Sequence, residues 1–271
     1  MDVTPVQARR FRGTVYGYYR KHRRDFPWRR TTDPYRILVS EVMLQQTQTD
    51  RVVPKYREFV RRFPTVASLA RATAWDVLAA WQGLGYNRRA VALQKAARAI
   101  AERHHGRVPS DHEELGELPG IGPYTAAAVV VFAFNRPAVM VETNIRTVLI
   151  HHFFRNRRKV DDRELMPILE ATLDRRNPRR WYSALMDYGA SLKKSMPNPG
   201  RKSAHYTIHS TFAGSDRQVR GAVIRLLLER PMTMRHMGKR MLVPRVRLAA
   251  VVHQLTKEQL IQRTGRWYRI I

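Results

Sequence analysis

Two glutamates each adjoin a short apolar run of the sequence. Glu41 precedes the apolar run 42–44, and Glu142 follows the apolar run 139–141. We expect Glu41 to lie near a helix in a partly desolvated pocket, where burial raises the pKa of a carboxyl group and keeps its proton available near neutral pH. Taken without its flanking residues, Glu41 would be interpreted as a surface carboxylate of a helix; a general acid is the interpretation that the flanking motif below favours.

A second motif has the residue types that hold a phosphate. Residues 118–126 read Leu-Pro-Gly-Ile-Gly-Pro-Tyr-Thr-Ala and lead into an apolar helix. Two glycines two positions apart allow a tight turn, whose backbone N–H groups and following helix N-terminus point at one phosphate oxygen. We expect the hairpin of a helix-hairpin-helix, which positions a nucleic acid without reading its bases. An ordinary turn between helices is the alternative. The expected contact residues are Leu118, Gly120, Gly122 and Thr125.

The net charge indicates the partner of these motifs. The 271 residues include 50 Lys and Arg against 22 Asp and Glu, which gives a formal charge of +28 and a pI near 11.4. Each cation set against a phosphate releases counterions, so a folded chain with this excess favours a polyanion. Nucleic acid is the first expectation. A passive basic surface, as on a ribosome-associated or anionic-membrane-associated protein, is the alternative.

Several other chemistries are excluded or not expected. The chain has no cysteine, so disulfides, thiolate zinc sites, cysteine nucleophiles and Cys-ligated iron–sulfur clusters are impossible. The pairs 104–105 and 151–152 are neighbouring histidines, which face different ways on a helix. No phosphate-binding loop or dinucleotide fingerprint occurs. We therefore expect no metal and no cofactor.

The sequence shows no pattern of a membrane span or of a secretion signal. The longest apolar stretch, 125–134, is well short of the ~20 residues that a membrane span needs. Residues 1–12 contain no apolar segment followed by small residues. We expect a cytoplasmic protein.

The elements that must position these motifs are predicted to be helices. Apolar residues follow the 3.6-residue period over 66–81 and 91–100, and Pro and Gly turns separate such segments. Residues 1–194 therefore predict an all-α domain of many short helices. The Pro-, Gly- and Ser-containing segment 195–214 is expected to be a linker.

The C-terminal segment 215–271 predicts a second, small domain. Its pattern indicates three helices and then alternation around a Thr-Gly turn, which is typical of a winged helix. It carries thirteen Lys and Arg against three Asp and Glu. We expect Arg245, Arg247 and Arg266 to lie against a duplex. A small dimerisation module, or a winged helix that binds protein, is the alternative.

Four segments together resemble one family. They are Phe-Pro-Trp-Arg at 26–29, Ser-Glu-Val-Met-Leu-Gln-Gln-Thr-Gln at 40–48, Trp-Gln-Gly-Leu-Gly-Tyr at 81–86 and Val-Glu-Thr-Asn-Ile-Arg-Thr-Val at 141–148. With the glycine hairpin, they resemble the catalytic domain of the MutY-type adenine DNA glycosylases, in the endonuclease III superfamily of helix-hairpin-helix glycosylases. The resemblance runs from about residue 26 to 190 in the family's order and spacing, and the string at 40–48 is highly specific.

The resemblance implies roles for the two acids. Glu41 would protonate a purine ring nitrogen and so turn the base into a leaving group. Glu142 stands where the superfamily has an Asp that stabilises the oxocarbenium-like sugar, a two-carboxylate logic shared with glycoside hydrolysis. Asn144 would orient this acid. The extra methylene of Glu shifts the carboxylate by roughly 1 Å, which costs ~10²-fold where the backbone does not compensate. Full activity, altered substrate and lost activity all stay open.

The resemblance also implies how a base is reached. A base must leave the duplex before its glycosidic bond is accessible. Gln46 would fill the stack and Tyr86 would wedge beside the opposite base, while Trp28 and Arg29 line the pocket. Tyr124 stands where bifunctional relatives have the lysine that forms a Schiff base, so a monofunctional enzyme is implied.

Some residues depart from the family or are better explained by packing. Trp81 is expected in the core. Asn87 stands where many relatives have a second Tyr.

We do not expect two larger features of the family in this chain. Most relatives follow the segment matching 186–190 with four cysteines that hold an iron–sulfur cluster, and many end in a domain that recognises 8-oxoguanine. This chain continues Ser-Leu-Lys-Lys at 191–194 and has no cysteine. We expect four cations to supply the positive charge that a cluster loop would aim at phosphate, namely Lys193, Lys194, Arg201 and Lys202.

The sequence as a whole predicts a mainly α helix-hairpin-helix glycosylase with a winged helix. It would be a monofunctional, monomeric and nucleoid-associated enzyme that excises adenine or a related purine from mismatched or damaged duplex DNA. A mismatch uracil or thymine glycosylase, a catalytically silent lesion-binding protein and a basic transcription regulator are the alternatives.

Overall fold

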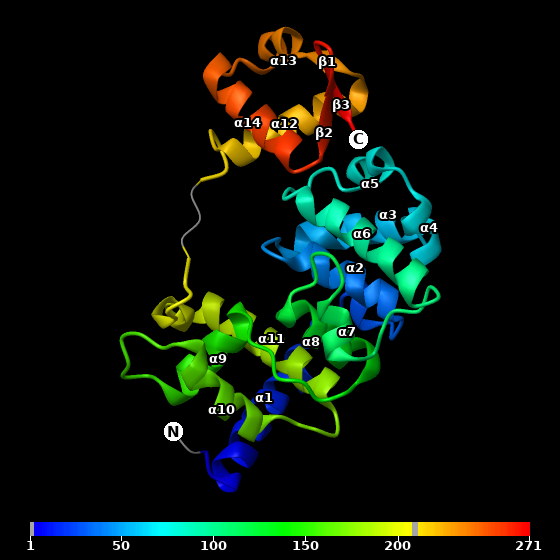
Figure 1. The fold of residues 1–271 in the computed structure, drawn as a ribbon. Helices are drawn as coiled ribbons and strands as arrows, with labels where there is room; N and C mark the ends of the chain where they lie inside the picture. The colour runs from blue at the N-terminus through cyan, green and yellow to red at the C-terminus, as the bar shows by residue number, and fades with distance from the viewer. Residues whose placement is uncertain (1–2, 208–210) are drawn as a thin grey trace. The chain divides into compact units, whose positions relative to one another are not determined.

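The computed structural model describes residues 3–207 and 211–271, which form helices joined by short turns and one small sheet (Figure 1). The prediction of a mainly α fold is confirmed. Chain contacts divide the molecule into two compact units. Unit 1 comprises 1–37, 110–116 and 122–208, and unit 2 comprises 38–109, 117–121 and 209–271.

Unit 1 brings the N-terminal helix against helices from the middle of the chain. Helix α1 packs on α10 and α11, as the blue and yellow-green ribbons in Figure 1 show. The core includes Phe11 and Trp181, whose ring centroids lie 5.8 Å apart. Helix α8 is apolar on all sides and most of its residues are buried, as expected of a central helix. The elements of unit 1 are α1 (Pro5–His22), η1 (Pro27–Arg29), α7 (His112–Gly116), α8 (Pro123–Phe134), α9 (Thr143–Phe153), α10 (Asp162–Thr172), α11 (Pro178–Ser195) and η2 (Pro199–Lys202).

Unit 2 begins inside a helix, because α2 (Pro34–Leu44) crosses the division at residue 38. Its core includes Trp81, which is fully buried and packs edge-on to Phe59 at 5.8 Å, so the expectation of a core residue is confirmed. Its other helices before the C-terminal part are α3 (Thr49–Arg62), α4 (Val66–Arg71), α5 (Ala74–Ala80) and α6 (Arg88–Arg103).

The apolar period over 66–81 corresponds to two helices and not to one. Helix α4 ends at Arg71, and Thr73 caps α5 by accepting from the backbone N–H of Asp76 at 3.1 Å. The Asp76 carboxylate in turn accepts a hydrogen bond from the Thr73 backbone N–H, which completes a capping box. Both helices keep their apolar faces on the core, which explains why the period passes through the break.

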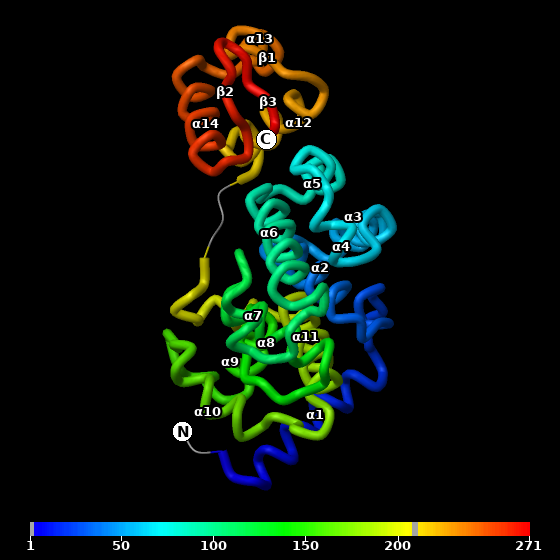
Figure 2. Tube along the Cα trace, turned by 45° about the vertical axis from the view of Figure 1, so that its right-hand side comes forward, coloured from blue at the N-terminus to red at the C-terminus, as the bar shows by residue number. Residues whose placement is uncertain are grey.

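The C-terminal part of unit 2 has the predicted three helices and hairpin (Figure 2). Strands β2 and β3 pair antiparallel around the Thr-Gly turn, with Ile261 opposite Ile270. A two-residue strand that the sequence did not indicate joins them, and the sheet order is β1-β3-β2. The elements are α12 (Asp216–Glu229), β1 (Met232–Thr233), α13 (Met234–Met241), α14 (Arg245–Lys257), β2 (Ile261–Thr264) and β3 (Trp267–Ile270).

The segment predicted as a linker begins with ordered structure. Its η2 turn contacts α9, and Val160 bridges to Ser203. Residues 208–210 of this segment lie outside the described residues. Among the described helices, none is long and apolar enough to cross a membrane.

Candidate active site

Glu142 forms the N-cap of α9 in unit 1. Its carboxylate accepts from the backbone N–H groups of Asn144 at 2.7 Å and of Ile145 at 2.9 Å. The apolar run before it takes the side chain out of water, while the positive end of the helix favours its charge. Burial is the larger effect and raises the pKa of the Glu142 carboxyl; Lys193 and the hydrogen bonds oppose it. The site therefore contains a half-buried acid with fixed geometry.

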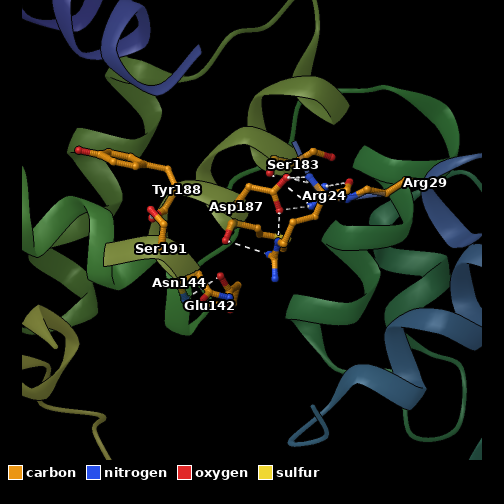
Figure 3. A network of polar contacts seen from close by, with 9 residues as sticks. Arg24, Arg29, Glu142, Asn144, Ser183, Asp187, Tyr188 and Ser191 are labelled. Atoms are coloured by element: carbon orange, nitrogen blue, oxygen red, sulfur yellow. Dashed lines mark hydrogen bonds and ion pairs between the residues drawn. The ribbon is translucent and has the colours of Figure 1, made fainter. Parts of the chain in front are cut away.

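Asn144 is directly bonded to this acid, as the resemblance implied. Its Nδ2 donates to Glu142 Oε2 at 3.2 Å, and its Oδ1 accepts from Lys193 Nζ at 2.8 Å. Figure 3 shows Glu142 and Asn144 side by side. Lys193 was expected to face DNA phosphate, and its ammonium instead lies on an amide of the site. Lys194, the next residue, is exposed.

A buried carboxylate that sequence reasoning missed lies beside these residues on α11. Asp187 is 2% exposed and accepts from Arg24 Nε at 2.6 Å and from both terminal nitrogens of Arg29, at 2.7 and 2.9 Å (Figure 3). Arg29 also donates to the Arg24 carbonyl at 2.9 Å. These bonds fix the segment that carries Trp28, whose ring stacks on Phe26 at 5.0 Å. A lone Asp in a helical pattern carries no signal that it will be buried with two arginines.

Glu41 lies in unit 2 on α2 and is 6% exposed. Ser40, Val42 and Met43 beside it are also buried. The expectation that the apolar run takes this carboxyl group out of water is therefore confirmed. An acid in such surroundings is a candidate proton donor.

Gln46 and Tyr86 both occupy turns in the left-handed region, with φ of 52° and 48°. Gln46 is exposed, and Tyr86 is 38% exposed. The region is rare for residues other than glycine, and its cost of about 1–3 kcal/mol is sustained only where neighbours fix the backbone. Both side chains thus stand at the tips of constrained turns.

Arg89 supplies that constraint and was missed by the sequence analysis. Its Nη1 donates to the carbonyls of Val42 at 2.8 Å and Met43 at 3.1 Å, which end α2, and also to the Gln45 carbonyl. Its Nη2 donates to Thr47 at 3.0 Å, and its guanidinium lies 5.3 Å from the Tyr86 ring centroid. Burial lowers the pKa of Arg89 to about 10. One signal in the sequence could have indicated Arg89: the last carbonyls of a helix have no partner within the helix and need donors from elsewhere.

The glycine hairpin has the expected turn. Ile121 N–H donates to the Leu118 carbonyl at 3.0 Å, Gly120 has a φ of +76°, and Gly122 is the N-cap of α8. Leu118 and Thr125 are buried, at 2% each, so their side chains hold the turn and do not reach outward. Tyr124, in the first turn of α8, is half-buried.

The basic residues of the C-terminal part differ in their surroundings. Arg245 and Arg266 are exposed. Arg247 instead pairs with Asp216 at 2.7 Å and donates to the Gly214 carbonyl. Arg247 thus helps hold α14 to the start of α12.

The chain after α11 does not fit the iron–sulfur cluster of most relatives. No cysteine occurs, and the segment packs by other means: Gly200 of η2 lies so close to Thr147 that an added β-carbon would stand 2.8 Å from its hydroxyl. Lys202 Nζ donates to the Arg155 carbonyl at 2.6 Å. In the described residues, no group of three or more His, Cys, Asp and Glu is placed to hold a metal.

Comparisons with known proteins show the family of the chain. The family model described as HhH-GPD superfamily base excision DNA repair protein matches residues 39–172. An adenine DNA glycosylase of Mycobacterium tuberculosis is 34% identical over 278 residues, which cover 92% of this chain and 90% of the relative. A thymine/uracil-DNA glycosylase of Pyrobaculum aerophilum is 36% identical over 171 residues, which cover 60% of this chain and 74% of the relative.

A solved structure also supports assignment of the chain to the DNA glycosylases. The structure of a thermostable thymine-DNA glycosylase matches with a TM-score of 0.66 and 28% identity, over 73% of this chain and 93% of that one. The chain is therefore a DNA glycosylase of base excision repair, and it belongs to the HhH-GPD superfamily and, within it, to the family of the adenine DNA glycosylases.

Proposed function

We propose that this enzyme excises adenine, or a related purine, from mismatched or damaged duplex DNA. The observation that carries the proposal is the half-buried Glu142 carboxylate, which caps α9 and accepts a hydrogen bond from Asn144, in a chain with relatives named adenine DNA glycosylase. A purine needs a proton on a ring nitrogen to become a good leaving group, and the buried Glu41 is the residue suited to give it.

The proposed reaction assigns one step to each acid. Glu41 gives its proton to the base, and the electron pair of the N-glycosidic bond leaves with the base. Glu142 stabilises the positive charge that develops on the sugar, and Asn144 holds the Glu142 carboxylate in place. Water then adds its hydroxyl to C1′, and its remaining proton returns to a carboxylate. The products are a free base and an abasic site.

We propose that the enzyme is monofunctional and acts as a monomer on flipped bases. Tyr124 has no amine, so it cannot form the Schiff base that leads to strand cleavage. Gln46 and Tyr86, at constrained turn tips, are suited to fill the gap that the base leaves. The hairpin and the exposed Lys194, Arg245 and Arg266 would hold the phosphates. We expect the enzyme to reside with the nucleoid DNA.

Thymine or uracil opposite guanine is the second candidate substrate. The similarity to a thymine/uracil-DNA glycosylase and to the structure of a thymine-DNA glycosylase favours it. A pyrimidine depends less on ring protonation, so the two candidates differ in how strongly they require Glu41.

A panel of single-lesion duplexes tests the proposal. It contains A opposite G, C and 8-oxoguanine, hypoxanthine, and U and T opposite G, and alkali reveals abasic sites after incubation. We expect release of adenine, no strand cleavage before alkali, and no release by Glu41→Gln with duplex binding retained. Wild-type turnover by Glu41→Gln, or release of U and T alone, would overturn the purine assignment.

A further inference from the structure

Helix α11 approaches the N-terminus of α9 at backbone distance. Gly189 faces the backbone of Asn144, and a β-carbon added at Gly189 would overlap the Asn144 carbonyl. Residues four apart share one face of a helix, so Lys193 stands one turn beyond Gly189 on this same face. The glycine therefore brings the Lys193 side chain within reach of the polar groups that begin α9.

Lys193 determines which way the Asn144 amide points. An ammonium group has only donors and an ionised carboxylate has only acceptors. With Lys193 Nζ 2.8 Å from Oδ1, the amide oxygen is directed to the lysine and Nδ2 is left to donate to Glu142 at 3.2 Å. Without the ammonium, the amide gains a second orientation in which its oxygen would face the carboxylate.

Lys193 also acts on the charge of Glu142. Burial raises the pKa of the Glu142 carboxyl, and Lys193 is the largest influence in the opposite direction. Burial lowers the pKa of Lys193, while Glu142 raises it and Arg24 lowers it.

The other charged groups around the site have partners of their own. Arg146 donates two hydrogen bonds of 2.7 Å to Asp162. These bonds, and the charges of Asp162, Glu142 and Tyr124, raise the pKa of Arg146. Arg24 is bonded to Asp187. Lys193 is thus the cation whose ammonium is committed to the Asn144–Glu142 pair.

We propose that Lys193 is a positioning residue for the excision reaction, one that orients Asn144 and favours the ionised form of Glu142. This inference rests on the proposed function, because the ionised form of Glu142 is the one that stabilises a cationic sugar. The same lysine stands three positions after the segment 186–190. A residue expected to bind phosphate is thus assigned a part in the chemistry.

The pH dependence of single-turnover base release tests this role. Glu142 must be ionised, so its pKa sets the acid limb, whereas loss of the proton that the base receives sets the basic limb. We expect Lys193→Met to move the acid limb upward by about one pH unit, with about tenfold slower release on that limb, because an opposite charge within ~6 Å shifts a carboxyl pKa by about 1–3 units. The basic limb should stay in place. Lys193→Arg, which keeps the charge, should restore most of the acid limb.

Lys194→Met is the matched control. It removes the same charge from the adjacent, exposed position, so we expect weaker duplex binding but an unmoved acid limb. An acid limb that is the same in Lys193→Met as in the wild type, or one that moves equally in Lys194→Met, would overturn the inference.

A second measurement does not depend on activity. NMR of ¹³C-carboxyl-labelled glutamate reports the titration of Glu142 in the DNA-free enzyme, with Glu142→Gln identifying its signal. We expect the midpoint to rise in Lys193→Met and not in Lys194→Met. An unchanged midpoint would overturn the inference even if bases are released. A raised midpoint in Lys193→Met, together with a wild-type enzyme that releases no base, would overturn the proposed function and leave the Lys193–Glu142 coupling in place.

Discussion

Gly120 of the hairpin faces Ala92 of α6, and a β-carbon at Gly120 would stand 2.5 Å from the Ala92 β-carbon. The φ of +76° adds strain for any other residue. Gly122, two positions on, has a φ of −87°, and a β-carbon there would meet nothing within 4 Å. Only the first glycine is therefore required by the fold, and the second leaves open space where a phosphate is expected to approach.

Substitution of the two glycines should separate stability from binding. We expect Gly120→Ala to lower the free energy of unfolding by about 2–4 kcal/mol, from overlap and left-handed strain together. Gly122→Ala should change stability by less than about 0.5 kcal/mol and weaken binding to all duplexes about tenfold, because its methyl meets the backbone phosphate. Urea denaturation and fluorescence anisotropy measure the two effects. Unaltered affinity of Gly122→Ala would argue against phosphate binding at this turn.

Arg89 joins the end of α2 to the turns of Gln46 and Tyr86. We expect Arg89→Met to lower the free energy of unfolding by about 2 kcal/mol or more, because buried carbonyls lose charged donors. Base release should fall further than stability predicts, since both turn tips lose their support.

Arg88→Met is the control for Arg89→Met. Arg88 is exposed and lies 3.8 Å from Glu258, so its loss should cost under about 1 kcal/mol. Thermal unfolding and single-turnover release measured on both variants check the prediction. Equal effects of the two substitutions would contradict it.

These residues show what the sequence could predict and what it could not. The hairpin glycines and the C-terminal β2–β3 hairpin follow from local rules, because a Gly-rich turn and an alternating pattern depend on neighbours in the chain. Arg89 and Asp187 depend on carbonyls and arginines far along the chain, and a charged residue in a helical pattern is usually solvated. The short strand β1 pairs with β3 across the domain and has no period of its own.

The same reasoning applies to the candidate site. The buried position of Glu41 was predictable from the apolar run that follows it. The contact of Lys193 with Asn144 was not, because it depends on the close approach of α11 at Gly189, and a glycine inside a helix gives no sign of what it faces.

His152 should make the protein sensitive to acid. Its ring packs against Phe11 at 5.1 Å, and burial, then His151 and Arg155, lower its pKa from 6.5 to about 4. Between these values the unfolded chain binds a proton that the folded chain does not, so stability falls as the pH drops from 6.5 towards 4.

The size of the His152 effect is measurable against a variant. We expect about 1–2 kcal/mol between pH 7 and 5, after allowance for solvent screening of a partly exposed ring. His152→Gln, which cannot titrate, should show a flatter loss over this interval in urea denaturation. Parallel pH profiles of the two proteins would assign the acid sensitivity to other groups.

Glu142 combines a cap with a charge, and its substitutions should separate the two. Glu142→Gln keeps an oxygen for the backbone N–H groups of Asn144 and Ile145, so stability should change by less than about 1 kcal/mol. Base release should fall about 10²–10³-fold, because the carboxylate charge that faces the developing cation is gone. Glu142→Ala should lose both the charge and the cap, and so unfold more easily by about 1 kcal/mol. Release by Glu142→Ala at the wild-type rate would show that this carboxylate has no part in the chemistry, and equal stability of all three proteins would show that the cap contributes little.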